Sequence, residues 1–267
     1  NVASEEILSQ AECQLKIVLL VRMFPKKYEL VKRLLGKKIA NKALSIYKYL
    51  NNKKIGELNK YFMRLNGIEL EDVADYFDTY PKNNLVELFV NNLDDGGLKK
   101  YISEKVKGAV LFTGGGILKK EILSIPDVKF IHIHPGVVPD VRGADCFFWS
   151  YLLKGKAGYS VFYMNEGIDT GDILNKKEFL VDLDRNTLLP YSNDEIYQSI
   201  LQCYDPCLRI KTLIELLDNK QVEAETSGNK LDLMNLVFEN QNPDDGRMYF
   251  FMHKELRNFV INKLKKV

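Results

Sequence analysis

Short apolar runs with strand character alternate with helical patterns along this chain, and this alternation constrains its fold more than any other feature. Lys16–Val21 reads KIVLLV, a continuous apolar run typical of a strand buried on both faces. Strand-like runs return at Val73–Phe77, Gly108–Phe112 and Val128–His134, with polar or helical stretches between them. We therefore expect an α/β fold with a doubly wound, mainly parallel sheet.

The pattern changes to helical from Asp194 onward. Asn193 or Asp194 is a plausible N-cap, and Pro206 is expected to break or restart the helix. We therefore predict a core at residues 1–186 and a small C-terminal appendage of helix and strand at 187–267. The aromatic stretch Gly246–His253 and the basic amphipathic helix after it are expected to pack on the core or across a homodimer.

The chain lacks sequence features of a membrane or secreted protein. Its apolar runs are shorter than the ~20 residues of a membrane span, and its start does not resemble a secretory signal, so we expect a cytoplasmic location. The cysteines form no C-x-x-C pair, which favours reduced thiols. Cys203 and Cys207 share a helix face, but this spacing is more typical of core packing than of metal ligation. We predict no metal ion.

Positive charge is concentrated near the start of the chain. Residues 16–64 carry 14 Lys and Arg against two Glu, whereas the whole chain has a net charge of only +2. A basic face favours phosphate-bearing partners, either a nucleotide-linked small molecule or RNA. A solvated lysine-rich helix surface explains the same composition equally well.

The run Val128–His134 reads VKFIHIH and ends abruptly at Pro135-Gly136. Because side chains alternate across a strand, His132 and His134 are expected on one side and Ile131 and Ile133 on the other. Two imidazoles then lie at the C-terminal end of a strand, where open parallel sheets bind their ligands. Histidines that merely end a buried strand are the alternative.

Two segments together resemble the folate-dependent formyltransferases. The first, residues 132–145, reads HIHPGVVPDVRGAD, and the second, residues 166–174, reads EGIDTGDIL. The family includes methionyl-tRNA formyltransferase, glycinamide ribonucleotide formyltransferase and the sugar N-formyltransferases. Its catalytic strand carries N-x-H-P before a Gly-ended loop, and a later D-x-G turn completes the site. The resemblance covers residues 108–175 and implies a Rossmann-like formyltransferase core.

The resemblance implies a catalytic role for three residues. His134 would stabilise the developing oxyanion as an imidazolium, and Asp169 would orient it and assist removal of a proton from the attacking amine. The chain departs from the family pattern at His132, which stands where the family has asparagine. We expect a neutral His132 to donate a hydrogen bond to the formyl oxygen in place of that asparagine.

Further residues are assigned to ligands by the same resemblance. The folate pteridine would lie against Gly116, Ile117 and Leu118 and against the backbone near Met164, Asn165 and Glu166. Gly114–Gly116 alone indicates only a tight turn, since no G-K-[ST] or G-x-G-x-x-G pattern completes it. Arg142 is expected to bind a substrate phosphate or carboxylate through its planar guanidinium, with loop anchoring by Arg142 and Asp145 as the alternative.

The implied activity is transfer of a formyl group from 10-formyltetrahydrofolate, as co-substrate, to a primary amine. We expect a phosphorylated small-molecule acceptor, a nucleotide-linked amino sugar, because the chain after Asp169 is short for a tRNA-binding extension. Three alternatives stay open: formylation of another amine such as aminoacyl-tRNA, a folate-dependent hydrolase that releases formate, and a catalytically impaired domain that binds a ligand or partner. The impaired-domain alternative stays open because His132 stands where the family has its catalytic asparagine.

Overall fold

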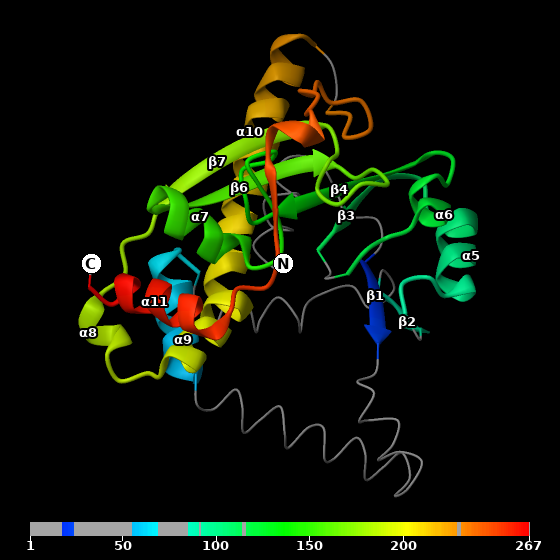
Figure 1. The fold of residues 1–267 in the computed structure, drawn as a ribbon. Helices are drawn as coiled ribbons and strands as arrows, with labels where there is room; N and C mark the ends of the chain where they lie inside the picture. Colours follow the sequence, from blue (N-terminus) through cyan, green and yellow to red (C-terminus); the bar gives the residue numbers. More distant parts are fainter. Residues whose placement is uncertain are drawn as a thin grey trace, which may run out of the picture.

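The computed structural model describes residues 18–23, 55–68, 85–90, 92–113, 116–228 and 231–266. The expected strand at Val73–Phe77, most of the basic segment 16–64, Cys13, Gly114 and Gly115 lie outside these residues. Within them the elements alternate between strand and helix, so the predicted α/β class is confirmed (Figure 1).

The sheet that carries the site has four strands in the order β3-β4-β6-β7. Their bounds are β3 Gly108–Phe112, β4 Val128–His134, β6 Lys156–Tyr163 and β7 Ile173–Leu180. β3 and β4 run parallel, whereas β4–β6 and β6–β7 are antiparallel. The sheet is therefore mixed, because β6 and β7 form a hairpin beside the parallel pair.

Two further strand pairs are parallel. β1 (Val18–Met23) pairs with β2 (Leu85–Val90), so the described part of the predicted first strand forms and continues to Met23. β5 (Val141–Gly143) pairs with β8 (Arg247–Tyr249), which joins the loop after β4 to the C-terminal part of the chain. Three of the five pairings among the described strands are parallel, in agreement with the expected mainly parallel arrangement.

Helices cover both faces of the four-stranded sheet. α10 (Asp205–Thr226) crosses one face (Figure 1). There Leu213, Leu216 and Leu217 pack against Ile131, Ile133 and Val161. α5 (Gly96–Lys105) and α6 (Lys120–Leu123) bury a separate apolar cluster with Val128 and Phe130 of β4. The alternation of side chains along β4 thus buries apolar residues on both faces.

A third apolar cluster joins elements from distant parts of the sequence. It contains side chains from the helix at residues 55–65, α7 (Cys146–Lys154), α9 (Asn193–Ser199) and α11 (Lys254–Leu264), with the short α8 (Arg185–Leu188) beside them. Residues after 187 therefore contact the core through α9, α10 and α11. How the chain divides into folding units stays a prediction.

The helix starts follow local capping rules. Ser192, one residue before the predicted caps, is the N-cap of α9, and its Oγ accepts a hydrogen bond from Glu195 N while Glu195 caps Ser192 in return. A π-helical turn at Ile200–Tyr204 follows, and Pro206 lies in the first turn of α10, where a missing N–H costs little. The backbone is helical on both sides of Pro206, so the expected break is absent and the hydrogen-bond pattern instead changes from π to α beside it. None of the helices in the described ranges is long and apolar enough to cross a bilayer.

Candidate active site

β4 places His132 and His134 on one face of the sheet, as the alternation predicts. In the strand register His132 lies opposite Phe112 of β3 and Phe162 of β6, and His134 lies opposite Ser160. The His132 ring packs against both phenylalanines, with ring centroids 5.8 Å apart in each case. The two imidazoles therefore occupy a partly apolar site at the C-terminal end of β4.

His134 is held by the loop that follows its strand. Its side chain is buried, and its Nε2 lies 3.2 Å from the carbonyl oxygen of Val141. The loop is fixed in turn by hydrogen bonds from Val138 N to Ser160 Oγ and from Val141 N to Val137 O, both 3.0 Å long. Because a carbonyl only accepts, the Nε2–H of His134 is the donor and its Nδ1 carries the lone pair.

Gly136 is the residue that lets the loop approach His134 so closely. A Cβ at this position would overlap the Val141 carbonyl oxygen and would lie 2.8 Å from His134 Nε2, closer than real Cβ contacts come. Any side chain at position 136 must therefore displace either the imidazole or its backbone partner.

Gly136→Ala is expected to destabilise the protein by about 1–3 kcal/mol, the usual cost of overpacking. The measurement is urea unfolding of the variant beside the wild type. Gly56→Ala is the matched control, because a Cβ there meets no atom within 4 Å and alanine favours the helix at 55–65. Equal stability of Gly136→Ala and wild type would show that the loop relaxes freely.

Asp169 is presented by a tight turn between β6 and β7. Asn165 folds this turn, since its Oδ1 accepts hydrogen bonds from Gly167 N and Thr170 Oγ1 and its Nδ2 donates to Thr170 O. Asp169 itself has a left-handed backbone with φ of 54°, a conformation that Asp and Asn tolerate better than most residues. The turn thereby directs the carboxylate back toward β4.

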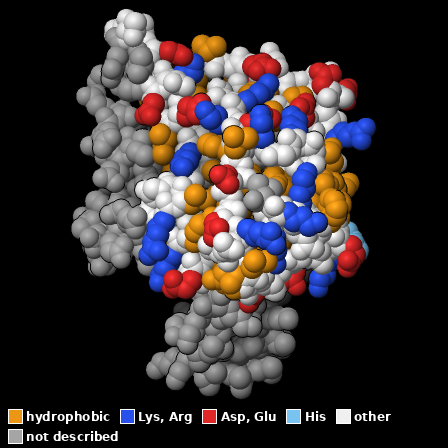
Figure 2. Space-filling model, turned by 90° about the vertical axis from the view of Figure 1, so that its left-hand side faces the viewer, with side chains coloured by type: hydrophobic (Ala, Val, Ile, Leu, Met, Phe, Trp, Pro, Cys, Tyr) orange, Lys and Arg blue, Asp and Glu red, His pale blue; other side chains and the backbone are white. Residues whose placement is uncertain are grey.

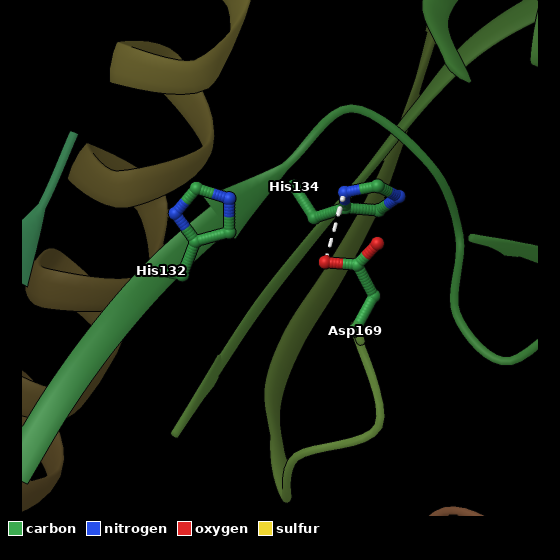
Figure 3. A group of neighbouring side chains, drawn as sticks. All are labelled: His132, His134 and Asp169. Carbon is green, nitrogen blue, oxygen red and sulfur yellow. Dashed lines mark ion pairs between the residues drawn. The ribbon is translucent and has the colours of Figure 1, made fainter. Parts of the chain in front are cut away.

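The three predicted catalytic residues are brought together. Asp169 Oδ1 lies 3.5 Å from His134 Nδ1, and Asp169 Oδ2 accepts a 2.9 Å hydrogen bond from Gly143 N (Figure 3). One ligand-type atom from each of His132, His134 and Asp169 lies within 4.8 Å of the others. A strand end and a distant turn therefore converge on one small site.

His132 has a defined proton position. Its Nδ1 lies 2.8 Å from the carbonyl oxygen of Phe112, so Nδ1 carries the hydrogen and donates it. The neutral ring then has a lone pair at Nε2, the nitrogen that Figure 3 shows on the side of His134 and Asp169. In this tautomer the N–H of His132 is already bound to Phe112. The expected donation from a neutral His132 to the formyl oxygen stays a prediction.

Burial keeps both histidines neutral at pH 7. It lowers the pKa of His132 to about 4, and it lowers the pKa of His134 to about 3 together with the positive charge of Arg209. His134 is therefore neutral in the unliganded site, and its expected role as an imidazolium in the reaction stays a prediction. Burial also raises the pKa of Asp169, although the hydrogen bond from Gly143 opposes that shift. The unliganded site therefore holds two neutral imidazoles beside the Asp169 carboxyl group.

Arg209 is a residue of this site that sequence analysis missed. It lies on α10, where its guanidinium binds Asp205 with Nη2–Oδ2 and Nε–Oδ2 distances of 2.7 and 2.8 Å. Its Nη1 donates to the carbonyl oxygen of Ile133, the residue between the two histidines. The Asp205–Arg209 spacing of four residues is a helix ion-pair pattern, but nothing in the sequence connects it to β4.

Arg142 is buried in β5 next to the candidate site, and its positive charge lowers the pKa of Asp169. Its neighbour Asp145 anchors the loop, because its carboxylate accepts hydrogen bonds from Tyr197 OH and Met252 N, both 2.8 Å long. Loop anchoring is thus shown for Asp145, whereas binding of a substrate phosphate or carboxylate by Arg142 stays a prediction.

The two segments predicted to bind folate lie side by side. Lys120, just after the first segment, forms a 2.8 Å ion pair with Glu166 in the second. Ile117 is 61% exposed, Leu118 is buried among the residues of the α5–α6 cluster, and Met164 is partly buried between that cluster and Phe162. Gly116 adopts a φ of 108°, which favours glycine. Asn165 uses its side chain within the turn.

Part of the chain matches a known protein family. The family described as "Formyl transferase" matches residues 91–200. Methionyl-tRNA formyltransferase of Clostridioides difficile is 43% identical over 79 residues, which is 29% of this chain and 25% of that protein. The enzyme of the same name from Wolbachia pipientis is 34% identical over 133 residues, or 49% and 41% of the two chains. This chain spans less than half the length of these curated relatives.

Solved structures show more distant likeness. A sugar N-formyltransferase from a Shewanella species has a TM-score of 0.39 at 18% identity, with 77% of this chain and 82% of that chain covered. HypX from Aquifex aeolicus, in complex with tetrahydrofolic acid, has a TM-score of 0.43 at 15% identity, with 68% and 29% covered. The sequence match is the stronger finding. Residues 91–200, which contain His132, His134 and Asp169, are similar to the formyl transferase family.

Proposed function

We propose that this chain transfers a formyl group from 10-formyltetrahydrofolate to a primary amine at His134 and Asp169. One observation carries the proposal: within the part that matches the family, a turn brings the Asp169 carboxylate to 3.5 Å from a buried imidazole at a strand end. Such a pair is suited to accept and hold a proton in a site of low polarity. The nucleophile is then the substrate amine.

The residues near Lys120 and Glu166 fit a flat aromatic donor. Ile117 offers an exposed apolar side chain, Met164 is partly buried, and the Lys120–Glu166 ion pair joins the two segments. These residues would hold the pteridine by apolar contact and by their backbone groups. When bound, 10-formyltetrahydrofolate supplies the formyl group.

The proposed chemical task of the protein is to handle one proton. As the amine attacks the formyl carbon it becomes more acidic, and the His134–Asp169 pair accepts the proton that it loses. His134 Nδ1 faces Asp169 Oδ1, so a proton between these atoms is stabilised by both. The same proton is then available for the folate nitrogen when its bond to the formyl carbon breaks. The imidazolium thus forms during the reaction rather than before it.

We propose a nucleotide-linked amino sugar as the acceptor. A small phosphorylated amine needs only a few cationic side chains near the site. Arg142 and Arg209 are two such side chains, because both lie close enough to Asp169 to lower its pKa against the effect of burial. Figure 2 shows Lys and Arg interspersed with Asp and Glu over the described face, without the basic stripe that suits RNA. Aminoacyl-tRNA is the second candidate, because the curated relatives are named methionyl-tRNA formyltransferases.

Mass spectrometry of candidate acceptors incubated with 10-formyltetrahydrofolate tests both proposals. We expect the acceptor to gain one formyl group, with a nucleotide-linked amino sugar modified faster than aminoacyl-tRNA. An RNA acceptor would also lose affinity steeply as salt rises, whereas a small phosphorylated amine would lose it only modestly. Absence of a formylated product with every amine, despite folate binding, would favour the impaired ligand-binding domain instead.

A further inference from the structure

Three lone pairs converge at the C-terminal end of β4. The hydrogen bonds of His132 to Phe112 and of His134 to Val141 use one nitrogen of each ring, which leaves Nε2 of His132 and Nδ1 of His134 as acceptors. Asp169 Oδ2 is bound to Gly143 N, so Oδ1 is the oxygen that faces the imidazoles. Figure 3 shows all three groups directed toward the same space.

The hydrogen bonds around these three groups are those that usually support metal-binding side chains. A metal-binding histidine usually donates its other ring N–H to a carbonyl or carboxylate, which fixes the tautomer and the ring orientation. Both histidines meet that condition with backbone carbonyls, and the backbone N–H of Gly143 orients the carboxylate.

We propose that His132, His134 and Asp169 bind one divalent transition-metal ion of the Zn²⁺ or Fe²⁺ class. Two imidazoles and one carboxylate are a known ligand set for these ions and leave coordination positions open. Bonds of about 2.1 Å keep any two ligands within about 4.2 Å of each other. In the structure the three ligand atoms lie within 4.8 Å of one another. A small rotation of the side chains would therefore bring them to the distances that a metal ion requires.

His132 completes this ligand set, and it is the residue at which the chain departs from the N-x-H-P pattern. With asparagine at this position the site would hold one imidazole and one carboxylate, and an amide oxygen is a poor ligand for Zn²⁺. Histidine in place of asparagine at position 132 therefore adds a third metal ligand to the His134–Asp169 pair.

Metal binding regulates the reaction, a consequence that rests on the proposed function. A bound ion occupies the lone pairs of His134 and Asp169 that are needed to accept the proton of the amine. The metal-bound protein is therefore inactive in formyl transfer, and a chelator restores the activity. Metal binding itself requires no folate and no amine.

The test is a titration of the metal-stripped full chain with Co²⁺, followed by competition with Zn²⁺. We expect one ion per chain and a visible d–d absorption band without the thiolate charge-transfer bands that Cys203 or Cys207 would give. His132→Asn and His134→Ala should each weaken the affinity by roughly 10² or more, because each removes a ligand. Circular dichroism checks that both variants are folded.

His253→Asn is the matched control. His253 is the third histidine of the chain and is the exposed N-cap of α11, a position that asparagine also fills well. This variant should bind Co²⁺ as the wild type does. Equal Co²⁺ affinity of wild type, His132→Asn and His134→Ala, or no binding at all, would overturn the metal site. Metal binding, with no formylation of any amine even after a chelator has removed the metal, would refute the proposed function alone. Formylation without metal binding would refute this inference alone.

Discussion

Asp169→Asn is expected to lower the rate of formyl transfer by about 10² or more while leaving the fold intact. The substitution removes the carboxylate that would share the proton of the amine with His134 Nδ1 in the proposed reaction. It preserves the shape of the side chain, and the amide oxygen can still accept the hydrogen bond from Gly143 N. The left-handed backbone at position 169 is also compatible with asparagine. The measurement is single-turnover formylation with a chelator present, so that metal binding does not enter the result.

Asp127→Asn is the control for this experiment. Asp127 is exposed in the loop before β4, and its φ of 60° is close to that of Asp169. Its substitution makes the same chemical change in the same backbone conformation away from the histidines, so we expect the wild-type rate. If Asp169→Asn were as active as Asp127→Asn, the carboxylate would have no part in proton transfer.

Asp205→Ala should lower the free energy of unfolding by about 3 kcal/mol. Asp205 is buried, and its carboxylate binds both the Arg209 guanidinium and the hydroxyl of Tyr159, which is also fully buried. The alanine variant leaves a cation and a hydroxyl without their shared acceptor. We place the loss at the low end for a buried ion pair, because the Arg209 side chain keeps 28% exposure and can reach water.

Urea unfolding measures this loss, and Asp218→Ala on the same helix is its control. Asp218 is exposed on α10, so its replacement should change the stability by no more than about 0.5 kcal/mol. Asp205→Asn should be less damaging than Asp205→Ala, since its amide oxygen still accepts from Tyr159. A stability of Asp205→Ala equal to that of Asp218→Ala would mean that the network makes no net contribution.

Local sequence rules predicted the strand that carries the site. β4 has the bounds that its apolar pattern indicated, and its two-residue alternation placed both histidines on one face. The predicted turn near Asp169 also forms. These features depend on residues close together in the sequence, where the spacing of apolar residues and a few turn-forming residues decide the geometry.

The charge state and proton positions of the histidines depend on partners that the sequence does not identify. The Phe112 carbonyl meets His132 only because β3 and β4 pair in one particular register. Arg209 reaches Ile133 O from a helix much later in the chain. Long-range packing thus made His134 neutral where the resemblance implied a cation, and it fixed the tautomer of His132 opposite to the expected donor role.

The three residues of β5 have a consequence for how this site varies among related sequences. The Val141 carbonyl orients His134 and the Gly143 amide orients Asp169, so both groups of the proton-carrying pair are supported by main-chain atoms of one strand. Main-chain donors and acceptors survive most side-chain substitutions. Selection can therefore change the acceptor-binding side chains around the site while the dyad keeps its geometry. A change in β8 that shifts its partner β5 would move His134 and Asp169 together. Substitutions in β8 and in this pair should therefore have strongly non-additive effects when they are combined.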